Sequence, residues 1–316
     1  MTGVQTCALP ISVRRRLAAL DYQETINFSF VDERWERELA GNADPIRLLN
    51  PMASHWAVMR SSLIGSLIGV LRFNLARKAS RVRVFEAGRV YLRDAGVGDG
   101  DASVAGIHQP MRLAGLAFGG ADTTQWSVKD KPVDFFDIKG DIEVLFAPAA
   151  VRFVAAEHPA MHPGRCARIE VDGQAVGFAG ELHPKWRQAY ELPAAPLMFE
   201  LDMAALTRRD VPAFTPIQRQ QSVWRDLAVI AGETVTCEGL MSTIAMARSG
   251  LVRSARLFDV YKPAVTPANM AAGERSLAVR LELLDDETPL TDERIDAAVA
   301  DVLATLSQRL GVRLRV

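Results

Sequence analysis

The sequence is poor in cysteine: its 316 residues include only Cys7, Cys166 and Cys237. No two of them form a CxxC pair, so the chain offers neither a disulfide framework nor a zinc-binding cysteine motif. Disulfides persist in oxidising compartments, whereas reduced cysteines are typical of the cytosol. A cytoplasmic protein is therefore expected.

An excess of one charge and a long apolar run are also absent. Thirty-seven Lys and Arg residues oppose thirty-eight Asp and Glu residues, for a formal net charge of −1. This balance excludes nucleic-acid binding through overall positive charge, although not through a local basic face. The most apolar stretch, Ser61–Phe73, already contains Arg72, whereas a membrane helix needs about 20 apolar residues. We expect no membrane association, and the length predicts about two domains.

The signatures of several enzyme classes are missing. The chain has no GxxxxGKS/T, GxGxxG or GxSxG motif, so phosphate-loop, dinucleotide-binding and serine-hydrolase chemistry lack their minimal residues. His158, His162 and His183 are candidates for a metal site, but each of them precedes a proline. A histidine before a proline is more typical of a turn, in which the imidazole is hydrogen-bonded, than of a zinc site, in which several ligands converge. We therefore predict no metal site and no catalytic residue.

A second candidate for metal binding is the acidic set Asp134, Asp137, Asp141 and Glu143. The first three of these residues share one helical face, because they are three and four positions apart. A solvated helix face with capping carboxylates explains them better than a metal site.

The first twelve residues differ from the rest of the chain. Met1–Ser12 (MTGVQTCALPIS) shows no helical period and lacks the basic and apolar regions of a signal peptide. The string resembles a translated sequencing-library adapter, with the alternative of a disordered natural tail. We therefore expect native sequence to begin near Val13, and deletion of Met1–Ser12 to change stability by less than about 0.5 kcal/mol.

The first half of the chain predicts an α+β domain on an antiparallel sheet. Alternating or apolar runs predict strands, and Asp172-Gly173 between two of them is a strong hairpin signal. The strands are expected at Thr25–Val31, Pro45–Pro51, Arg83–Tyr91, Arg112–Phe118, Arg152–Ala156, Cys166–Val171, Ala175–Gly180 and Leu197–Leu201. Helical spacing predicts helices at Val13–Asp21, from Ser62 for about four turns, at Asp137–Phe146 and at His183–Tyr190.

A charged, proline-containing linker, Arg208–Pro216, precedes a second region with a clearer pattern. Leu277, Val279, Leu281 and Leu283 alternate with polar residues and predict a half-buried strand. The elements expected are strand Arg225–Ala231, a helix from Thr236 to Ser249, strands Arg256–Tyr261 and Arg275–Leu284, a helix from Thr291 to Leu310, and strand Val312–Val316. This βαββαβ order is that of a ferredoxin-like fold.

Basic and aromatic residues of the second region indicate RNA binding. Acidic residues gather at its second helix and the preceding loop, so a near-neutral domain can still offer phosphates a positive face. Trp224 and Tyr261 can stack on unpaired bases. The predicted tRNA-binding residues are Arg219, Trp224, Arg225, Arg253, Arg256, Tyr261, Lys262, Arg275 and Arg280.

Taken together, these segments resemble the C-terminal part of the bacterial phenylalanyl-tRNA synthetase beta subunit. The strings that carry the resemblance cover nearly everything from residue 13 onward. They are DYQETINFSFVD (Asp21–Asp32), LLNPMASHWAVMRSSLIGSLI (Leu48–Ile68), NLAR (Asn74–Arg77), RVFEAGRVY (Arg83–Tyr91), DFFDIKGDIE (Asp134–Glu143), HPGRCARIEVDGQAVGFAGELHP (His162–Pro184), WRDLAVI (Trp224–Ile230) and LFDVY (Leu257–Tyr261).

The resemblance implies two domains. Residues 13–212 would form a catalytically silent copy of the class II synthetase fold, and residues 213–316 a ferredoxin-fold anticodon-binding domain. The family's oligonucleotide-fold, editing and magnesium-coordinating portions have no counterpart here. QRQQSVW (Gln218–Trp224) also departs from the Phe-Pro that many relatives carry at the entry strand.

The resemblance further implies a fragment that holds tRNA and docks the catalytic alpha subunit of an alpha2-beta2 phenylalanine–tRNA ligase. ATP and Mg²⁺ are expected in the holoenzyme, not on this chain, because Arg83 and Arg89 lack a Gly-rich, arginine-bearing third motif downstream. The apolar residues Leu63, Leu67, Val70 and Leu71 of the helix from Ser62 are the predicted docking residues. The alternatives are a free-standing RNA-binding module and, more weakly, a metal-dependent enzyme using the His-Pro corners; DNA is not an expected partner.

Overall fold

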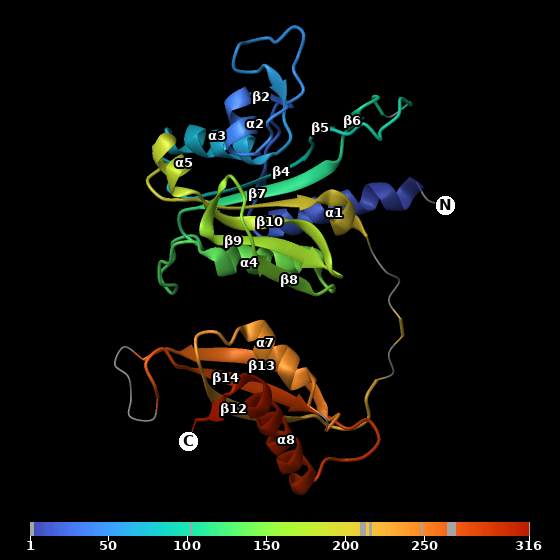
Figure 1. The fold of residues 1–316 in the computed structure, drawn as a ribbon, viewed down its shortest axis with the longest axis vertical. Helices are drawn as coiled ribbons and strands as arrows, with labels where there is room; N and C mark the ends of the chain where they lie inside the picture. The colour runs from blue at the N-terminus through green and yellow to red at the C-terminus, as the bar shows by residue number, and fades with distance from the viewer. Residues whose placement is uncertain are drawn as a thin grey trace. The chain divides into compact units, whose positions relative to one another are not determined.

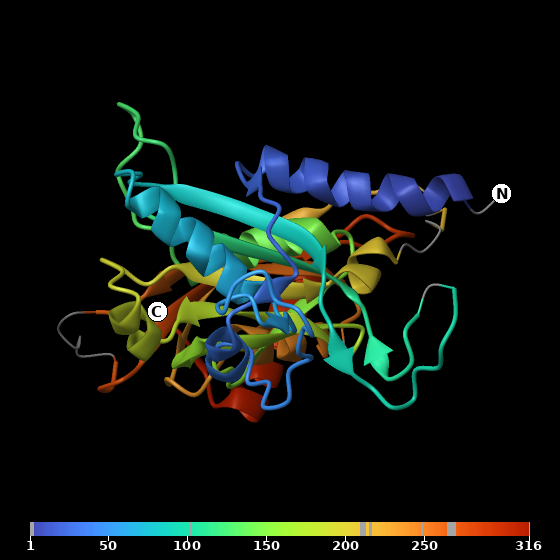
Figure 2. The same ribbon diagram turned by 90° about the horizontal axis from the view of Figure 1, so that it is seen from above.

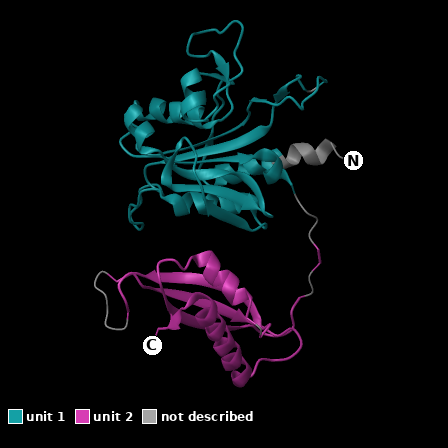
Figure 3. Ribbon diagram, viewed as in Figure 1, with its two compact units in different colours: residues 1–210 teal, residues 211–316 magenta. Residues whose placement is uncertain are grey.

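The computed structural model describes two compact units, residues 1–210 (unit 1) and residues 211–316 (unit 2) (Figures 1 and 3). Residues 1–2, 102, 209–212, 215–216, 248, 264–269 and 316 lie outside the described residues, as do the side chains of residues 3–9. Most of the predicted linker Arg208–Pro216 therefore lies outside the description. None of the described helices has the length and apolar character that crossing a membrane requires.

Unit 1 is built on a seven-stranded sheet in the order β1-β4-β7-β11-β10-β9-β8. Neighbouring strands are antiparallel except for the parallel pair β1–β4, so the sheet agrees with the predicted α+β class. The strands are β1 (Gln23–Glu24), β4 (Val82–Arg89), β7 (Met111–Phe118), β8 (Val151–Ala155), β9 (Met161–Val171), β10 (Gln174–Leu182) and β11 (Leu197–Asp202).

Helices cover both faces of this sheet. One hydrophobic core holds residues of α1 (Gly3–Ala19), α4 (Phe135–Phe146) and α6 (Met203–Thr207). The other holds residues of α2 (Glu33–Glu38), α3 (Ile64–Leu75) and α5 (Pro184–Ala189). Two short pairs complete the unit: β2 (Phe30–Val31) with β3 (Val58–Met59), and β5 (Leu92–Arg93) with β6 (Ile107–His108). The β5–β6 hairpin projects from the body of unit 1 in both ribbon views (Figures 1 and 2).

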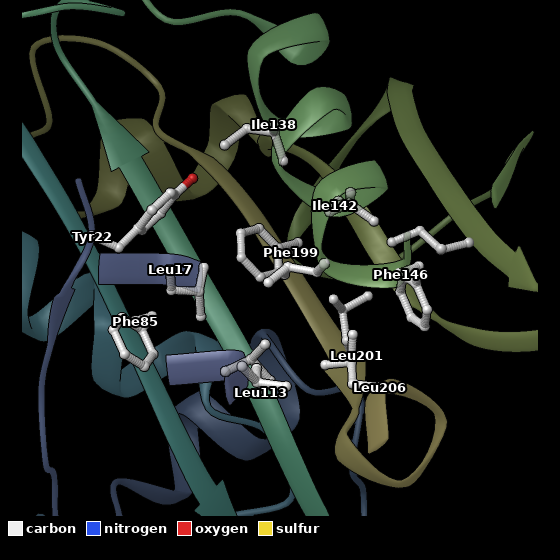
Figure 4. Packing of buried hydrophobic residues seen from close by; sticks show 14 of the residues in the cluster. Leu17, Tyr22, Phe85, Leu113, Ile138, Ile142, Phe146, Phe199, Leu201 and Leu206 are labelled. Carbon is white, nitrogen blue, oxygen red and sulfur yellow. The ribbon is translucent and has the colours of Figure 1, made fainter. Parts of the chain in front are cut away.

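Phe199 lies near the centre of the first core (Figure 4). It pairs across the sheet with Gly115, and a Cβ added at Gly115 would stand only 2.3 Å from the Phe199 ring. Tyr22 meets the same ring edge-on at 6.1 Å between centroids. The glycine therefore provides the space into which the Phe199 ring packs.

Local signals in unit 1 have the expected structural effects. Asp172 and Gly173 both have positive φ, 51° and 75°, as the predicted hairpin turn requires. Asp134 and Asp137 form a capping box at the start of α4. Asp141, by contrast, is not on a solvated face: it is buried, accepts a hydrogen bond from Tyr22 Oη at 2.8 Å, and lies 3.3 Å from the Arg83 guanidinium. Burial raises the pKa of Asp141.

Two predicted strands of unit 1 are wrong. In Thr25–Val31, only Phe30–Val31 forms a strand, and Ile26 is 92% exposed. Side chains and isolated backbone hydrogen bonds hold the segment: Asn27 donates to Glu86 Oε2 at 2.7 Å, Arg60 donates to the Phe28 carbonyl, and the Thr25 N–H donates to the Phe85 carbonyl. In Pro45–Pro51 only Arg47 forms an isolated bridge, since a proline has no N–H to donate to a ladder.

The first helix also differs from expectation. It begins at Gly3 rather than near Val13. Val13 and Leu17 are buried in the core and fix the later turns, and adding residues to an existing helix needs no new nucleation. The helix therefore includes part of the segment in which the sequence shows no helical period.

Unit 2 follows the predicted βαββαβ order, with a four-stranded antiparallel sheet ordered β13-β14-β12-β15. Its elements are β12 (Val223–Ala231), α7 (Cys237–Ala245), β13 (Val252–Tyr261), β14 (Arg275–Leu283), α8 (Asp292–Leu310) and β15 (Arg313–Leu314). Thr236 and Thr291 cap the two helices, and Gly311 ends α8 in the left-handed conformation. The ferredoxin-like arrangement is thus confirmed, although α7 ends at Ala245 rather than Ser249.

Candidate nucleic-acid interface

The sheet of unit 2 has two chemically different faces. The alternating residues Leu277, Val279, Leu281 and Leu283 of β14 are buried against α7 and α8, as predicted (Figure 1). The residues between them belong to the opposite face, which we call the open face. Cross-strand pairing places Trp224 beside Glu282 and Ser254, and Asp226 beside Arg280 and Arg256. In a third row Tyr261 is exposed, whereas its neighbours Ile230 and Ser276 are buried.

Three aromatic side chains of β12 and β13 are accessible. Trp224 is 52% exposed, Phe258 51% and Tyr261 42%. The Arg280 guanidinium lies 5.3 Å from the Phe258 ring centroid, and that of Arg315 lies 5.0 Å from Tyr261. Half-exposed rings flanked by guanidinium groups are suited to stacking on unpaired bases.

The predicted positive charge of this face and its surroundings is partly neutralised. Arg280 donates two hydrogen bonds of 2.7 Å to the Asp226 carboxylate, which holds the pKa of Asp226 below its ordinary value. Lys262 lies 3.7 Å from a Glu233 carboxylate oxygen. Two further carboxylates, Asp259 of β13 and Glu282 of β14, lie on the same sheet. The open face is therefore mixed in charge, because the sheet carries its own acids besides those of α8.

The predicted tRNA-binding residues divide into two groups. Trp224, Arg256, Tyr261 and Arg280 share the open face. The others lie elsewhere: Arg225 and Arg275 alternate toward the helix-covered side, Arg253 lies at a bulge in β13, Lys262 follows β13, and the exposed Arg219 precedes β12. The Arg275 guanidinium donates to the Val235 carbonyl at 2.6 Å and so stabilises unit 2 itself.

Sequence reasoning missed Phe258 and Arg315 as members of this face. Strict alternation from Arg256 places Phe258 on the open face, so this signal was present in the sequence. The pairing of β13 with β14 shifts register between Val252 and Ser254 and again between Leu257 and Asp259. Each shift changes which of the following residues belong to the open face, and the sequence does not reveal it because it depends on the pairing of the two strands. Arg315 reaches the face only because β15 returns beside β12.

Of the three histidines that precede prolines, His158 lies before a turn and His183 caps α5, whereas His162 lies in β9 rather than in the predicted turn. In each case the ring Nδ1 accepts the backbone N–H two residues later: His158 from Ala160 at 3.2 Å, His162 from Gly164 and His183 from Lys185, both at 3.0 Å. Desolvation and the nearby Arg112 lower the pKa of His158 to about 4. Among the described residues no group of His, Cys, Asp and Glu is arranged to hold a metal ion.

Comparison with known proteins places both units in one family. Residues 8–203 match the model of the phenylalanyl tRNA synthetase beta chain CLM domain, and residues 218–315 match the ferredoxin-fold anticodon binding domain. The chain belongs to the phenylalanyl-tRNA synthetase beta chain family. The CLM match begins inside the segment predicted to be non-native, whose origin stays a prediction.

Similar proteins support the assignment to this family. The chain is 49% identical over 308 residues to the phenylalanine–tRNA ligase beta subunit of Cupriavidus pinatubonensis, and 52% identical over 308 residues to that of Burkholderia lata. In both comparisons the match covers 96% of this chain and 38% of the relative. The chain therefore spans about two fifths of the length of these relatives.

An apolar groove lies on unit 1 of this family member. It has a volume of about 560 Å³ between the segment from Thr25 to Val31, α2 and α3. Phe28 stacks on Phe30 at 5.4 Å and contacts Trp56 at 5.0 Å between centroids. The accessible apolar residues that line it are Ile26, Phe28 and Phe73.

Most of the predicted docking residues do not reach this groove. Leu63, Leu67 and Leu71 are at most 1% exposed and belong to the core between α3 and the sheet, so the prediction that they contact a partner is wrong. Helical spacing identifies an apolar face but does not tell whether a sheet or a partner covers it. Val70, half-buried, is the one predicted docking residue that lines the groove.

Proposed function

We propose that this chain is the tRNA-holding, alpha-subunit-docking part of a phenylalanine–tRNA ligase, and that it supports ATP-dependent aminoacylation without carrying the catalytic site. The observation that carries the tRNA assignment is the set of half-exposed rings on the open face, Trp224, Phe258 and Tyr261. Membership of the family and the match of unit 2 to an anticodon-binding domain support it. A free-standing RNA-binding module is the alternative.

The aromatic rings provide the direct test. Replacing Trp224 or Tyr261 by alanine is expected to weaken binding of single-stranded RNA by about 1–3 kcal/mol each, because each ring stacks on one base. The salt dependence should change little, since neither ring carries charge. Titration of the chain with an unstructured oligonucleotide at several salt concentrations measures both quantities.

Trp126 supplies the matched control. It is 99% exposed and belongs to unit 1, so Trp126→Ala removes the same kind of side chain without removing a residue of the open face. Equal losses of affinity in Trp126→Ala and Trp224→Ala would contradict the assignment of the open face.

The proposed lack of a catalytic role rests on Arg83 and Arg89, the two arginines considered for binding a nucleotide. Arg83 donates to the Leu20 carbonyl, pairs with Asp141, and lies 4.9 Å from the Tyr22 ring centroid. Arg89 donates to the Gln109 carbonyl at 2.8 Å. Both guanidinium groups already bind partners within unit 1 instead of being free to bind a nucleotide. This supports the proposal that ATP and Mg²⁺ bind to the alpha subunit.

We expect the chain alone to form no phenylalanyl-adenylate. Phenylalanine-dependent exchange between ATP and pyrophosphate should stay at background until a catalytic alpha subunit is added. Measurable exchange in a preparation free of alpha subunit would refute the non-catalytic role.

The groove on unit 1 is the proposed docking surface for the catalytic alpha subunit. A soluble protein rarely leaves such a cluster of apolar side chains exposed unless a partner covers it. Ile26 is 92% exposed and Phe73 56%, and both line the groove. This surface replaces the buried face of α3 as the predicted contact.

Charge placed in the groove should abolish assembly. Ile26→Asp and Phe73→Asp are expected to prevent co-purification with an alpha subunit, because a carboxylate would be buried without a partner. Both residues are exposed in the free chain, so the melting temperature should be nearly unchanged. Leu49→Asp is the control, since Leu49 is 98% exposed and does not line the groove. Assembly unaffected by the groove substitutions would favour the free-standing module.

A further inference from the structure

A cluster of cations lies where the end of α3 meets α5 on unit 1. The Arg72 guanidinium lies 5.5 Å from the ring centroid of Tyr190, the residue that ends α5. Lys185 Nζ lies 4.4 Å from the centroid of Trp186. Arg187 precedes Tyr190 by three positions, so the two side chains are neighbours on one helical turn. Arg77 and Lys78 follow directly at the end of α3. These five cations are called the α3–α5 patch.

The cations of the patch have no carboxylate partners within the part of the chain that the structure describes. None of its five cations takes part in an ion pair among the described residues. The neighbouring helix α2 neutralises its own charge, because Arg34 pairs with Glu38, and Glu33 with Arg47. All five patch cations are exposed, so their charge is available to a ligand.

The rings beneath the patch are not available for base stacking. Trp186 is 4% exposed and Tyr190 8%, and both belong to the core of unit 1. They hold Lys185 and Arg72 in place through cation–π contacts. Phe73 is exposed, but Arg77 lies 3.4 Å from its centroid. A ligand at the patch therefore meets cations rather than ring faces.

We propose that the α3–α5 patch binds the phosphate backbone of a base-paired RNA stem. Phosphate is the anion that exposed Arg and Lys groups attract in RNA, and a duplex presents its phosphates while keeping its bases stacked inside. The open face of unit 2 differs in having accessible rings and a mixed charge. This inference rests on the proposed function for the identity of the ligand as RNA, and it assigns paired and unpaired RNA to different units.

Two RNA probes separate the two surfaces. The chain of 316 residues is titrated with a blunt RNA duplex of about 16 base pairs and with an unstructured single strand of the same length. The variant Arg72→Ala/Lys185→Ala/Arg187→Ala should bind the duplex at least tenfold more weakly. Its salt slope should fall by about 0.9 for each phosphate contact removed. Single-strand binding should change far less.

Matched variants test whether unpaired charge is the cause. Arg47→Ala/Arg93→Ala/Arg165→Ala removes three exposed guanidinium groups that each pair with a carboxylate, and it should leave duplex affinity within about twofold. Arg72→Lys/Lys185→Arg/Arg187→Lys keeps the charge and should retain the salt slope. A melting curve shows whether each variant is folded, and Lys185→Ala/Arg187→Ala replaces the triple variant if Arg72 is needed for folding.

The outcomes distinguish this inference from the proposed function. Duplex affinity and salt slope unchanged in the patch variant would overturn the inference, even if Trp224→Ala lowers single-strand affinity. Loss of alpha-subunit assembly with unchanged duplex binding would overturn it as well and identify a protein interface. Loss of duplex binding in the patch variant with no effect of Trp224→Ala would support the patch and contradict the role of the open face.

Discussion

Replacing Arg60 by methionine is expected to lower the free energy of unfolding of unit 1 by about 3–5 kcal/mol. Arg60 and Glu86 are 3% and 4% exposed at their side chains, with 2.7 Å between Nη1 and Oε1. Arg60 also donates to the carbonyls of Arg89 and Phe28. Methionine fills the volume but leaves the Glu86 carboxylate buried without its cation. Chemical denaturation of the chain measures the loss.

The double variant and an exposed pair provide the controls. Arg60→Met/Glu86→Gln should be clearly more stable than Arg60→Met alone, because the amide removes the unpaired charge. Arg93→Met, which breaks an exposed pair with Asp44, should cost no more than about 1 kcal/mol. Equal losses of unfolding free energy in Arg60→Met and Arg93→Met would show that the buried pair stabilises the chain no more than the exposed pair does.

We expect the Arg60–Glu86 pair also to influence the proposed docking of the alpha subunit. Glu86 accepts from Asn27, and Arg60 donates to the Phe28 carbonyl, so the pair fixes the segment that supplies the groove's aromatic residues. Arg60→Met should therefore weaken alpha-subunit assembly without altering any residue exposed in the groove.

Replacing Phe199 by alanine is the second change with a large expected effect. A fully buried phenylalanine lost from a core costs about 3–5 kcal/mol, because a cavity remains. Phe199 is fully buried in contact with Gly115 (Figure 4). Gly115→Ala should cost about 1–3 kcal/mol, because its new Cβ would meet the ring.

The two positions should also be coupled. In Gly115→Ala/Phe199→Leu the smaller side chain gives room to the added methyl group, so the double variant should lose less stability than the sum of the single changes. If the losses of stability, measured by thermal or urea denaturation, are additive, the side chain at 199 does not clash with the added methyl group at position 115.

Local patterns determined much of this protein. The alternation over Arg275–Leu283, the Asp172-Gly173 turn, the threonine caps of α7 and α8, and Gly311 all act through neighbours in the chain. Such features depend on periodicity, turn conformation and capping, which the sequence carries directly. The family itself was recognisable from strings such as those around Asp134–Glu143 and His162–Pro184.

Tertiary structure decided what those patterns could not. Whether Leu63, Leu67 and Leu71 face a sheet or a partner depends on the strands that pack against them. Ile26 and Phe28 alternate as a strand would, yet their segment is not a strand and contacts the buried Arg60–Glu86 pair through Asn27 and the Phe28 carbonyl. Asp226 neutralises Arg280 only because β12 and β14 are paired in one register. Each outcome is a contact between residues far apart in sequence, and no local period encodes such a contact.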